Sequence, residues 1–166
     1  MATLEELEQE AAAGHCSLER FCKGVAQLLQ VRAHEVAILS LRHSMLQFVY
    51  PLELRKTGMI PLISSAQAAK TASSKQAEIF NHFTSVRHNS IFETIKIGDE
   101  DPLTIQKLMS APILNPGGET VGVMQVCRKG ASLEEAGADF GPVDLLLLQS
   151  VARVFGRISG NLQERA

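Results

Sequence analysis

A Pro-Gly-Gly turn between two long apolar runs constrains the fold more than any other feature of this sequence. The runs are residues 103–114 and 120–128, and the turn reads Asn115-Pro-Gly-Gly-Glu119. Proline and glycine favour tight turns, and apolar segments on both sides of a short turn are typical of a β-hairpin. The chain is therefore expected to contain an antiparallel sheet.

Four further segments have the character of strands. Residues 36–42 and 45–50 are apolar runs joined by His43 and Ser44, which predicts a second hairpin. Residues 59–63 form a short run interrupted by a proline, and residues 77–81 read as a strand. The run 91–97 fits either a strand or a helical turn, and Gly98-Asp-Glu-Asp-Pro102 reads as a solvated loop.

Helical patterns begin and end the chain. Residues 4–13 have an apolar face, and Ser17 precedes a stripe of apolar residues spaced as on a helix. Residues 64–72 predict a short alanine-rich helix, and residues 130–141 a loop. A long helix is expected from Asp139 or Pro142 to about residue 163. It carries two apolar stripes, so we expect one to pack on the sheet and the other on a helix, of this chain or of a second copy.

Composition excludes several classes of protein. The chain has 166 residues, enough for one domain with a real core, and a formal net charge of -2, which argues against a nucleic-acid-binding surface. No apolar run approaches the roughly 20 residues that cross a bilayer, and the acidic N-terminus does not resemble a secretory signal. Cys16, Cys22 and Cys127 follow no disulfide framework. These features predict a cytoplasmic protein with reduced thiols that binds neither nucleic acid nor membranes.

Motifs for catalysis and for metal binding are missing from the sequence. It has no phosphate-binding Gly-rich loop, no Gly-x-Ser-x-Gly and no His-Glu-x-x-His. His82 and His88 are six residues apart, which does not suit a metal pair on a helix. We therefore expect neither an enzyme nor a metal site.

Four segments in a fixed order resemble the GAF domain family. They are Ile60-Pro-Leu followed by 66–72, then 108–114, then 118–129, and finally Phe140-x-x-x-Asp144 followed by 145–152. The resemblance covers roughly residues 36–160. It implies an α+β fold with a central antiparallel sheet of about six strands and the N- and C-terminal helices on one face. We expect a helical extension at 1–16 and the GAF-like domain at 17–163.

The resemblance also implies where a ligand would bind. GAF-like modules hold small molecules between the sheet and the segment that covers one face, here residues 64–102. The candidate ligand-binding residues in or near this segment are Tyr50, Phe80, His82, Phe83, Arg87 and His88. The alternative is a solvated loop with partly buried phenylalanines. The covering segment contains no cysteine, so a covalent chromophore is not expected, and the ligand itself remains unidentified.

A signature of cyclic-nucleotide-binding GAF domains is present only in part. Lys129, Phe140 and Asp144 match it, whereas Arg128 replaces the expected Asn and Leu145 the expected Glu. The Lys129–Asp144 pair is expected to pin the loop onto the last helix, which is a structural role.

Three functions are compatible with this resemblance. The first is a sensory module that binds a small metabolite or nucleotide and signals through a homodimer of its terminal helices. The second is a dimerisation or protein-interaction module without a ligand. The third is an enzyme of the methionine-sulfoxide-reductase type, which the cysteine positions do not favour.

Overall fold

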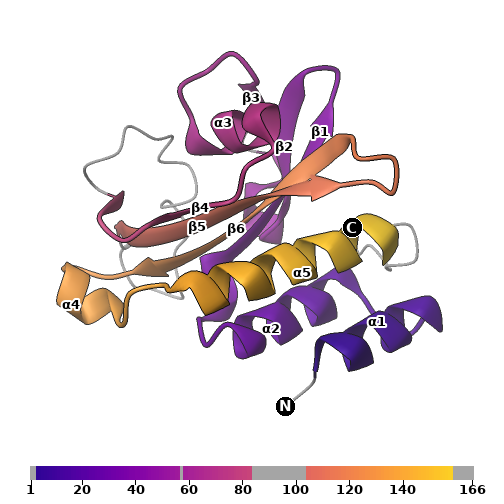
Figure 1. The fold of residues 1–166 in the computed structure, drawn as a ribbon, viewed down its shortest axis with the longest axis horizontal. Helices are drawn as coiled ribbons and strands as arrows, with labels where there is room; N and C mark the ends of the chain where they lie inside the picture. Colours follow the sequence, from indigo (N-terminus) through magenta and orange to yellow (C-terminus); the bar gives the residue numbers. More distant parts are fainter. Residues whose placement is uncertain (1–2, 57, 84–103, 159–166) are drawn as a thin grey trace.

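The fold is a six-stranded antiparallel sheet with helices on both faces (Figure 1). The computed structural model describes residues 3–56, 58–83 and 104–158. The strand order is β3-β2-β1-β6-β5-β4, and every neighbouring pair is antiparallel. The strands are β1 (Val36–Arg42), β2 (Met45–Tyr50), β3 (Met59–Pro61), β4 (Glu78–Phe80), β5 (Ile105–Leu114) and β6 (Thr120–Lys129). The α+β fold and the number of strands agree with the expectation.

The hairpin formed by β5 and β6 confirms the prediction made from the Pro-Gly-Gly turn. Asn115 closes the turn, because its side-chain Oδ1 accepts the backbone N–H of Glu119 at 2.9 Å. Gly118 has a φ of 84°, a backbone conformation that side chains disfavour. The turn therefore depends on these two residues, and by closing the hairpin it sets the register of β5 and β6, the longest strand pair.

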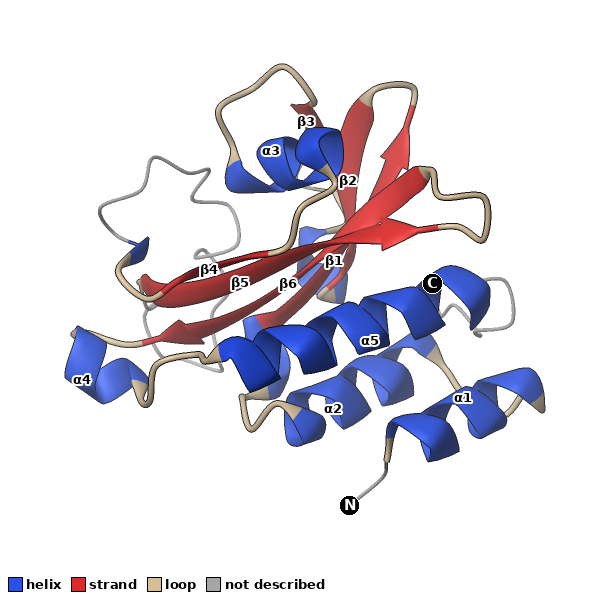
Figure 2. Ribbon diagram, viewed as in Figure 1, coloured by secondary structure: helices blue, strands red, loops and turns tan. Residues whose placement is uncertain are grey.

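The helices separate into two layers (Figure 2). The helices α1 (Leu4–Ala12), α2 (Leu18–Leu28) and α5 (Pro142–Ile158) cover one face of the sheet, called here the helical face. The opposite face, the α3 face, is covered by α3 (Gln67–Ser74). Short helices η1 (Ala33–Glu35), η2 (Leu52–Leu54) and α4 (Leu133–Ala136) complete the described elements. The predicted placement of the terminal helices on one face is confirmed.

Both apolar stripes of α5 are covered within this chain. Leu148 and Val151 are fully buried in the core of the helical face, and the Phe155 ring lies 5.6 Å from that of Phe21 on α2. Gly156 permits this packing, because a Cβ there would collide with the carbonyl oxygen of Leu114 on β5. Of the two alternatives, the second stripe therefore packs on a helix of the same chain.

Helix α1 shares the core of the helical face. Leu7 and Ala11 are fully buried, and the Leu7 side chain lies against Gly24 of α2. Glu8 also pairs with Arg157 of α5 at 2.6 Å. The boundary expected at residue 16 stays a prediction, and no break in packing marks it in the structure.

Some expected boundaries shift, and the three short helices η1, η2 and α4 were not expected. The predicted loop at 130–141 contains α4, whose N-terminus is capped by the Ser132 hydroxyl, which accepts the N–H of Glu135. A Ser-x-x-Glu spacing is the usual sign of such a cap. The segments 91–97 and 98–102 lie outside the described residues, as does the predicted end of the last helix. Among the described residues, no helix combines the length and apolar character needed to cross a bilayer.

Candidate functional site

The α3 face carries a chain of buried polar side chains inside an apolar layer. Ser110 and Gln125 are cross-strand partners on β5 and β6, and Gln125 Nε2 donates to Ser110 Oγ at 3.2 Å. Ser110 Oγ lies 2.7 Å from Thr71 Oγ1 on α3, and Thr71 Oγ1 donates to the Gln67 carbonyl. All four residues are buried. This network holds α3 on the sheet and places polar groups in the middle of an apolar face.

Sequence reasoning missed this network, although a signal was available. Ser110 and Gln125 interrupt apolar strands at positions that point to the same face of the sheet as Leu108 and Cys127. A polar residue on the buried face of a strand needs a hydrogen-bond partner. Their cross-strand pairing and the Thr71 hydroxyl supply those partners, which only the register reveals.

Three of the candidate residues lie together at the end of β4. Phe80 and Phe83 have ring centroids 5.9 Å apart, and both belong to the apolar cluster of the α3 face. His82 lies between them in sequence and is exposed. Arg87 and His88 lie outside the described residues. Ligand binding by these residues stays a prediction.

The structure corrects the expected position of Tyr50. Strict alternation would place Tyr50 on the same face as Leu46 and Phe48. A bulge breaks the alternation: Ile38 pairs with Tyr50, whereas Leu39 pairs with Phe48, leaving Val49 as an extra residue. Tyr50 therefore packs in the core of the helical face, where burial raises the pKa of its hydroxyl. It lies on the other side of the sheet from Phe80 and Phe83.

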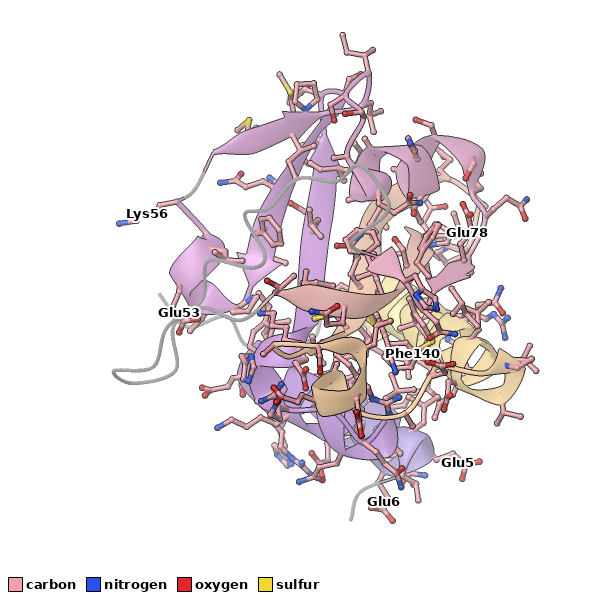
Figure 3. All side chains as sticks on the ribbon, turned by 90° about the vertical axis from the view of Figure 1, so that its left-hand side faces the viewer. Glu5, Glu6, Glu53, Lys56, Glu78 and Phe140 are labelled. Carbon is pink, nitrogen blue, oxygen red and sulfur yellow. The ribbon has the colours of Figure 1, made fainter. Side chains whose placement is uncertain are left out.

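The segment after β4 is joined directly to the start of α5. The Asn81 side chain donates from Nδ2 to the Phe140 carbonyl at 3.0 Å and accepts the Phe140 N–H at its Oδ1 at 2.9 Å. Phe140 is buried and stands two residues before Pro142, the first residue of α5. Figure 3 shows Phe140 where the sheet, α4 and α5 meet. The amide thus connects the predicted ligand cover to the C-terminal helix.

Two basic strand residues bind the loop that precedes α5, at residues 137–139. Lys107 on β5 donates to the Gly137 carbonyl and pairs with Asp139 at 2.9 Å. This hydrogen bond from Lys107 lowers the pKa of the Asp139 carboxyl. The Arg128 guanidinium on β6 lies 4.4 Å from the centre of the Phe140 ring and donates to the Ala138 carbonyl.

The expected Lys129–Asp144 pair is not formed among the described residues. Lys129 Nζ donates to the His34 carbonyl, on the α3 side of the sheet, whereas Asp144 accepts the backbone N–H of Gly141 and caps α5. Alternation along β6 explains the difference, because Lys129 points to the face opposite Arg128. Lys107 and Asp139 instead tie the loop before α5 to strand β5 of the sheet.

A buried carboxylate secures the end of the sheet beside Lys129. Glu35 accepts the Lys129 backbone N–H at 2.6 Å and both side-chain and backbone N–H groups of Arg32. Burial alone would raise the pKa of Glu35, but these hydrogen bonds hold it below its ordinary value. Next to it, both ring nitrogens of His34 are buried without a partner in the described structure. Burial, together with the Lys129 charge, lowers the pKa of this imidazole.

The cysteines and the metal-binding residue types form no reactive cluster in the described ranges. Cys16, Cys22 and Cys127 are all buried and free, and burial raises the pKa of Cys22 far above its ordinary value. Among residues 3–56, 58–83 and 104–158, no group of three His, Cys, Asp or Glu side chains is placed to hold a metal ion.

Comparisons with known proteins place this fold. The model of the GAF domain family matches residues 2–158, and no curated protein matches. The GAF domain of an Acinetobacter phosphoenolpyruvate-protein phosphotransferase is similar in structure, with a TM-score of 0.67 at 13% identity, covering 94% of this chain and 92% of that one. The GAF domain of A. aeolicus Nlh2 in an inactive state gives 0.60 at 20% identity, covering 92% and 90%.

A third similar structure is an enzyme. Free methionine-R-sulfoxide reductase from Neisseria meningitidis, solved in complex with its substrate, gives a TM-score of 0.57 at 14% identity, covering 92% of this chain and 83% of that one. At these identities the solved structures show the shared fold, while the family model spans nearly the whole sequence. The chain belongs to the GAF domain family.

Proposed function

We propose that this chain is a cytoplasmic signalling or regulatory module that senses a small molecule over its α3 face and reports binding through α5. The observation that carries this proposal is the double hydrogen bond between Asn81 and Phe140. A ligand that moves the end of β4 also moves Asn81. Because Phe140 stands only two residues before Pro142, the first residue of α5, the displacement reaches the helix through two hydrogen bonds and a short connection.

The α3 face offers both kinds of contact that a small ligand needs. Phe80 and the buried Phe83 place two aromatic rings at the end of β4, and Ser110, Thr71 and Gln125 place hydrogen-bonding groups within the same layer, where they are buried and bonded to one another, so a ligand would reach these groups only by displacing the segment that covers them. Binding sites for small molecules are mostly apolar with a few placed polar groups. A compact metabolite with a few hydrogen-bonding groups fits this combination.

Signalling through a homodimer of terminal helices is the second part of the proposal. Val143 and Leu146, one turn apart near the start of α5, are 77% and 63% exposed. They lie next to the residues that Asn81 holds, so a change at Phe140 would act on them first. An exposed apolar pair on a helix can pack against its copy across a twofold axis.

A thermal-shift screen of metabolites and nucleotides against the wild-type chain tests sensing. A positive compound is then titrated against wild type and Asn81→Ala while methyl NMR signals of Val143 and Leu146 are followed. We expect both proteins to bind the compound, but only the wild type to shift its α5 signals. Stabilisation by no compound, together with a constitutive dimer in light scattering, would instead identify a ligand-free dimerisation module.

We also propose that the chain catalyses no reaction. Its three cysteines are buried, and Cys127, which does lie on the α3 face, is fully covered by its neighbours. A thiol attacks as the thiolate, which burial disfavours. The assay is reduction of free methionine-R-sulfoxide with an excess of thiol reductant. Turnover by the wild type that disappears in Cys127→Ser would overturn this part of the proposal.

A further inference from the structure

A small cleft lies at the margin of the sheet, between the end of β5 and the exposed side of α5. Its volume is about 140 Å³. We call it the edge cleft, and the residues that line it are Lys75, Ala77, Pro112, Leu114, Gln149 and Arg153. It shares no residue with the polar network or the aromatic pair of the α3 face.

The edge cleft exists because β4 is shorter than its neighbour. Pairing of β4 with β5 stops at Glu78 and Ser110, whereas β5 continues to Leu114. Pro112 lies in the part of β5 that β4 does not reach, although β6 still pairs with it on the other side. Because proline has no N–H, it leaves no donor unsatisfied on the open side. The linker from α3 passes nearby, and Ala77 packs against the core of the helical face. The floor of the cleft is therefore apolar.

The charged groups of the edge cleft have one sign. Lys75 and Arg153 both line it, and no carboxylate does. Lys75 ends α3 in a left-handed conformation, and its Nζ donates to the Gly118 carbonyl at 3.0 Å, leaving two N–H groups for other acceptors. Gln149 adds an amide one helical turn before Arg153.

Arg153 has no hydrogen bond or ion pair to any residue that the structure describes. The contrast with Arg157, one turn later on the same helix, is direct, because Arg157 is paired with Glu8. A guanidinium can bind a carboxylate through two parallel hydrogen bonds. At the rim of a cleft with an apolar floor, Arg153 is placed to hold the head of a small anion while its tail contacts the floor.

We propose that the edge cleft binds a small aliphatic carboxylate, with the carboxylate between Arg153 and Lys75 and the hydrocarbon chain on Ala77, Pro112 and Leu114. The volume admits a chain of a few carbons. Such a ligand would tie the linker after α3 to the middle of α5, and would act on the output helix independently of the α3 face.

The test is an NMR titration of the whole chain with butyrate, at constant ionic strength adjusted with chloride. We expect saturable shifts in the backbone amides of residues 75–77 and 149–153, with a dissociation constant of about 1–10 mM for a ligand of this size. Arg153→Gln should weaken binding about fivefold or more, since it removes a charge-assisted pair. Acetate, which lacks the tail, should bind more weakly than butyrate.

The matched control is Arg157→Gln, which removes the same charge from the same helix outside the cleft. Butyrate should bind this variant as it binds the wild type. Equal weakening in the two variants would show general attraction to a basic helix and overturn the proposal. So would the absence of saturable shifts, or equal affinity for butyrate, acetate and inorganic phosphate, since the apolar floor would then contribute nothing.

Discussion

Asn81 and the backbone of Phe140 are joined by two hydrogen bonds, of 2.9 and 3.0 Å, in which the side-chain amide pairs with both the N–H and the C=O of one residue. The two residues are 59 positions apart. One lies after the edge strand β4 and the other before α5. This contact joins the end of β4 directly to the segment that leads into α5.

Replacing Asn81 tests the strength of that contact. Asn81→Ala removes both hydrogen bonds and leaves the backbone N–H and C=O of the buried Phe140 without these partners, so the free energy of unfolding should fall by about 1–3 kcal/mol. Asn81→Asp keeps an acceptor for the Phe140 N–H and loses only the donor, so the free energy of unfolding should fall less than in Asn81→Ala. Urea denaturation of the wild type, Asn81→Asp and Asn81→Ala measures the free energy of unfolding, which should decrease in that order. Equal stability of wild type and Asn81→Ala would show that water replaces the amide without loss.

The pinning of the loop before α5 predicts unequal effects for the two members of an ion pair. Lys107 is buried, whereas the Asp139 side chain is 67% exposed. Asp139→Asn should change the free energy of unfolding by less than about 1 kcal/mol, as for exposed pairs generally. Lys107→Met also leaves the Gly137 carbonyl without its donor and should be destabilising by about 1–3 kcal/mol. Chemical denaturation at low and high salt separates the ion pair with Asp139 from the hydrogen bond to the Gly137 carbonyl, since salt screens only the ion pair.

Much of the fold could be predicted because its signals are local. The turn at residues 115–119 and the cap at Ser17 each act within a few residues, and the structure has a hairpin and a helix start at these places. The two apolar stripes of α5 follow from periodicity, whereas only the structure shows that a helix of the same chain covers the second one. The family resemblance then ordered these elements correctly.

The candidate site was less predictable because its contacts are not local. Tyr50 was assigned to the wrong face, since a single bulge in β2 reverses the alternation and nothing in the sequence announces it. Lys129 was given Asp144 as a partner by motif, whereas the register of β6 turns it toward His34. The Asn81–Phe140 contact depends on how β4 meets the loop before α5, which no spacing along the chain reveals.

The dependence of stability on pH should show a step from His34. Its pKa is lowered in the folded state from an ordinary value of 6.5, so the unfolded chain binds protons first as the pH falls. Above about pH 6.5 the imidazole is neutral in both states and does not change the free energy of unfolding. Below that value the unfolded chain takes up a proton that the folded chain does not, so the free energy of unfolding falls. Urea denaturation between pH 8 and 5 should show the decline, and His34→Gln should flatten it.

A second variant and a separate pH range distinguish the step of His34 from the effect of other groups. His34→Asn, which also removes the imidazole, should flatten the profile in the same way as His34→Gln. Glu35 contributes in a different range: its pKa is lowered from 4.5, so its stabilisation is present above that value and is lost as the pH falls further. A decline that persists in His34→Gln above pH 5 would assign it to another group.

The close approach of α5 to β5 predicts an unusual outcome for a helical glycine. In a helix, Gly→Ala ordinarily stabilises by up to about 1 kcal/mol. At Gly156 the new methyl group would meet the Leu114 carbonyl, which belongs to a paired strand and cannot move alone, so Gly156→Ala should be destabilising by about 1–3 kcal/mol. Gly24→Ala is the matched comparison, because the three atoms nearest to its methyl group, the closest at 2.6 Å, all belong to the Leu7 side chain, and a side chain can rotate where a backbone carbonyl cannot. Thermal and urea unfolding should therefore rank Gly156→Ala as the more destabilised of the two. The reverse order would mean that α5 slides on the sheet more easily than Leu7 changes its rotamer, and a helix able to slide in this way could respond to a ligand without the Asn81 contact.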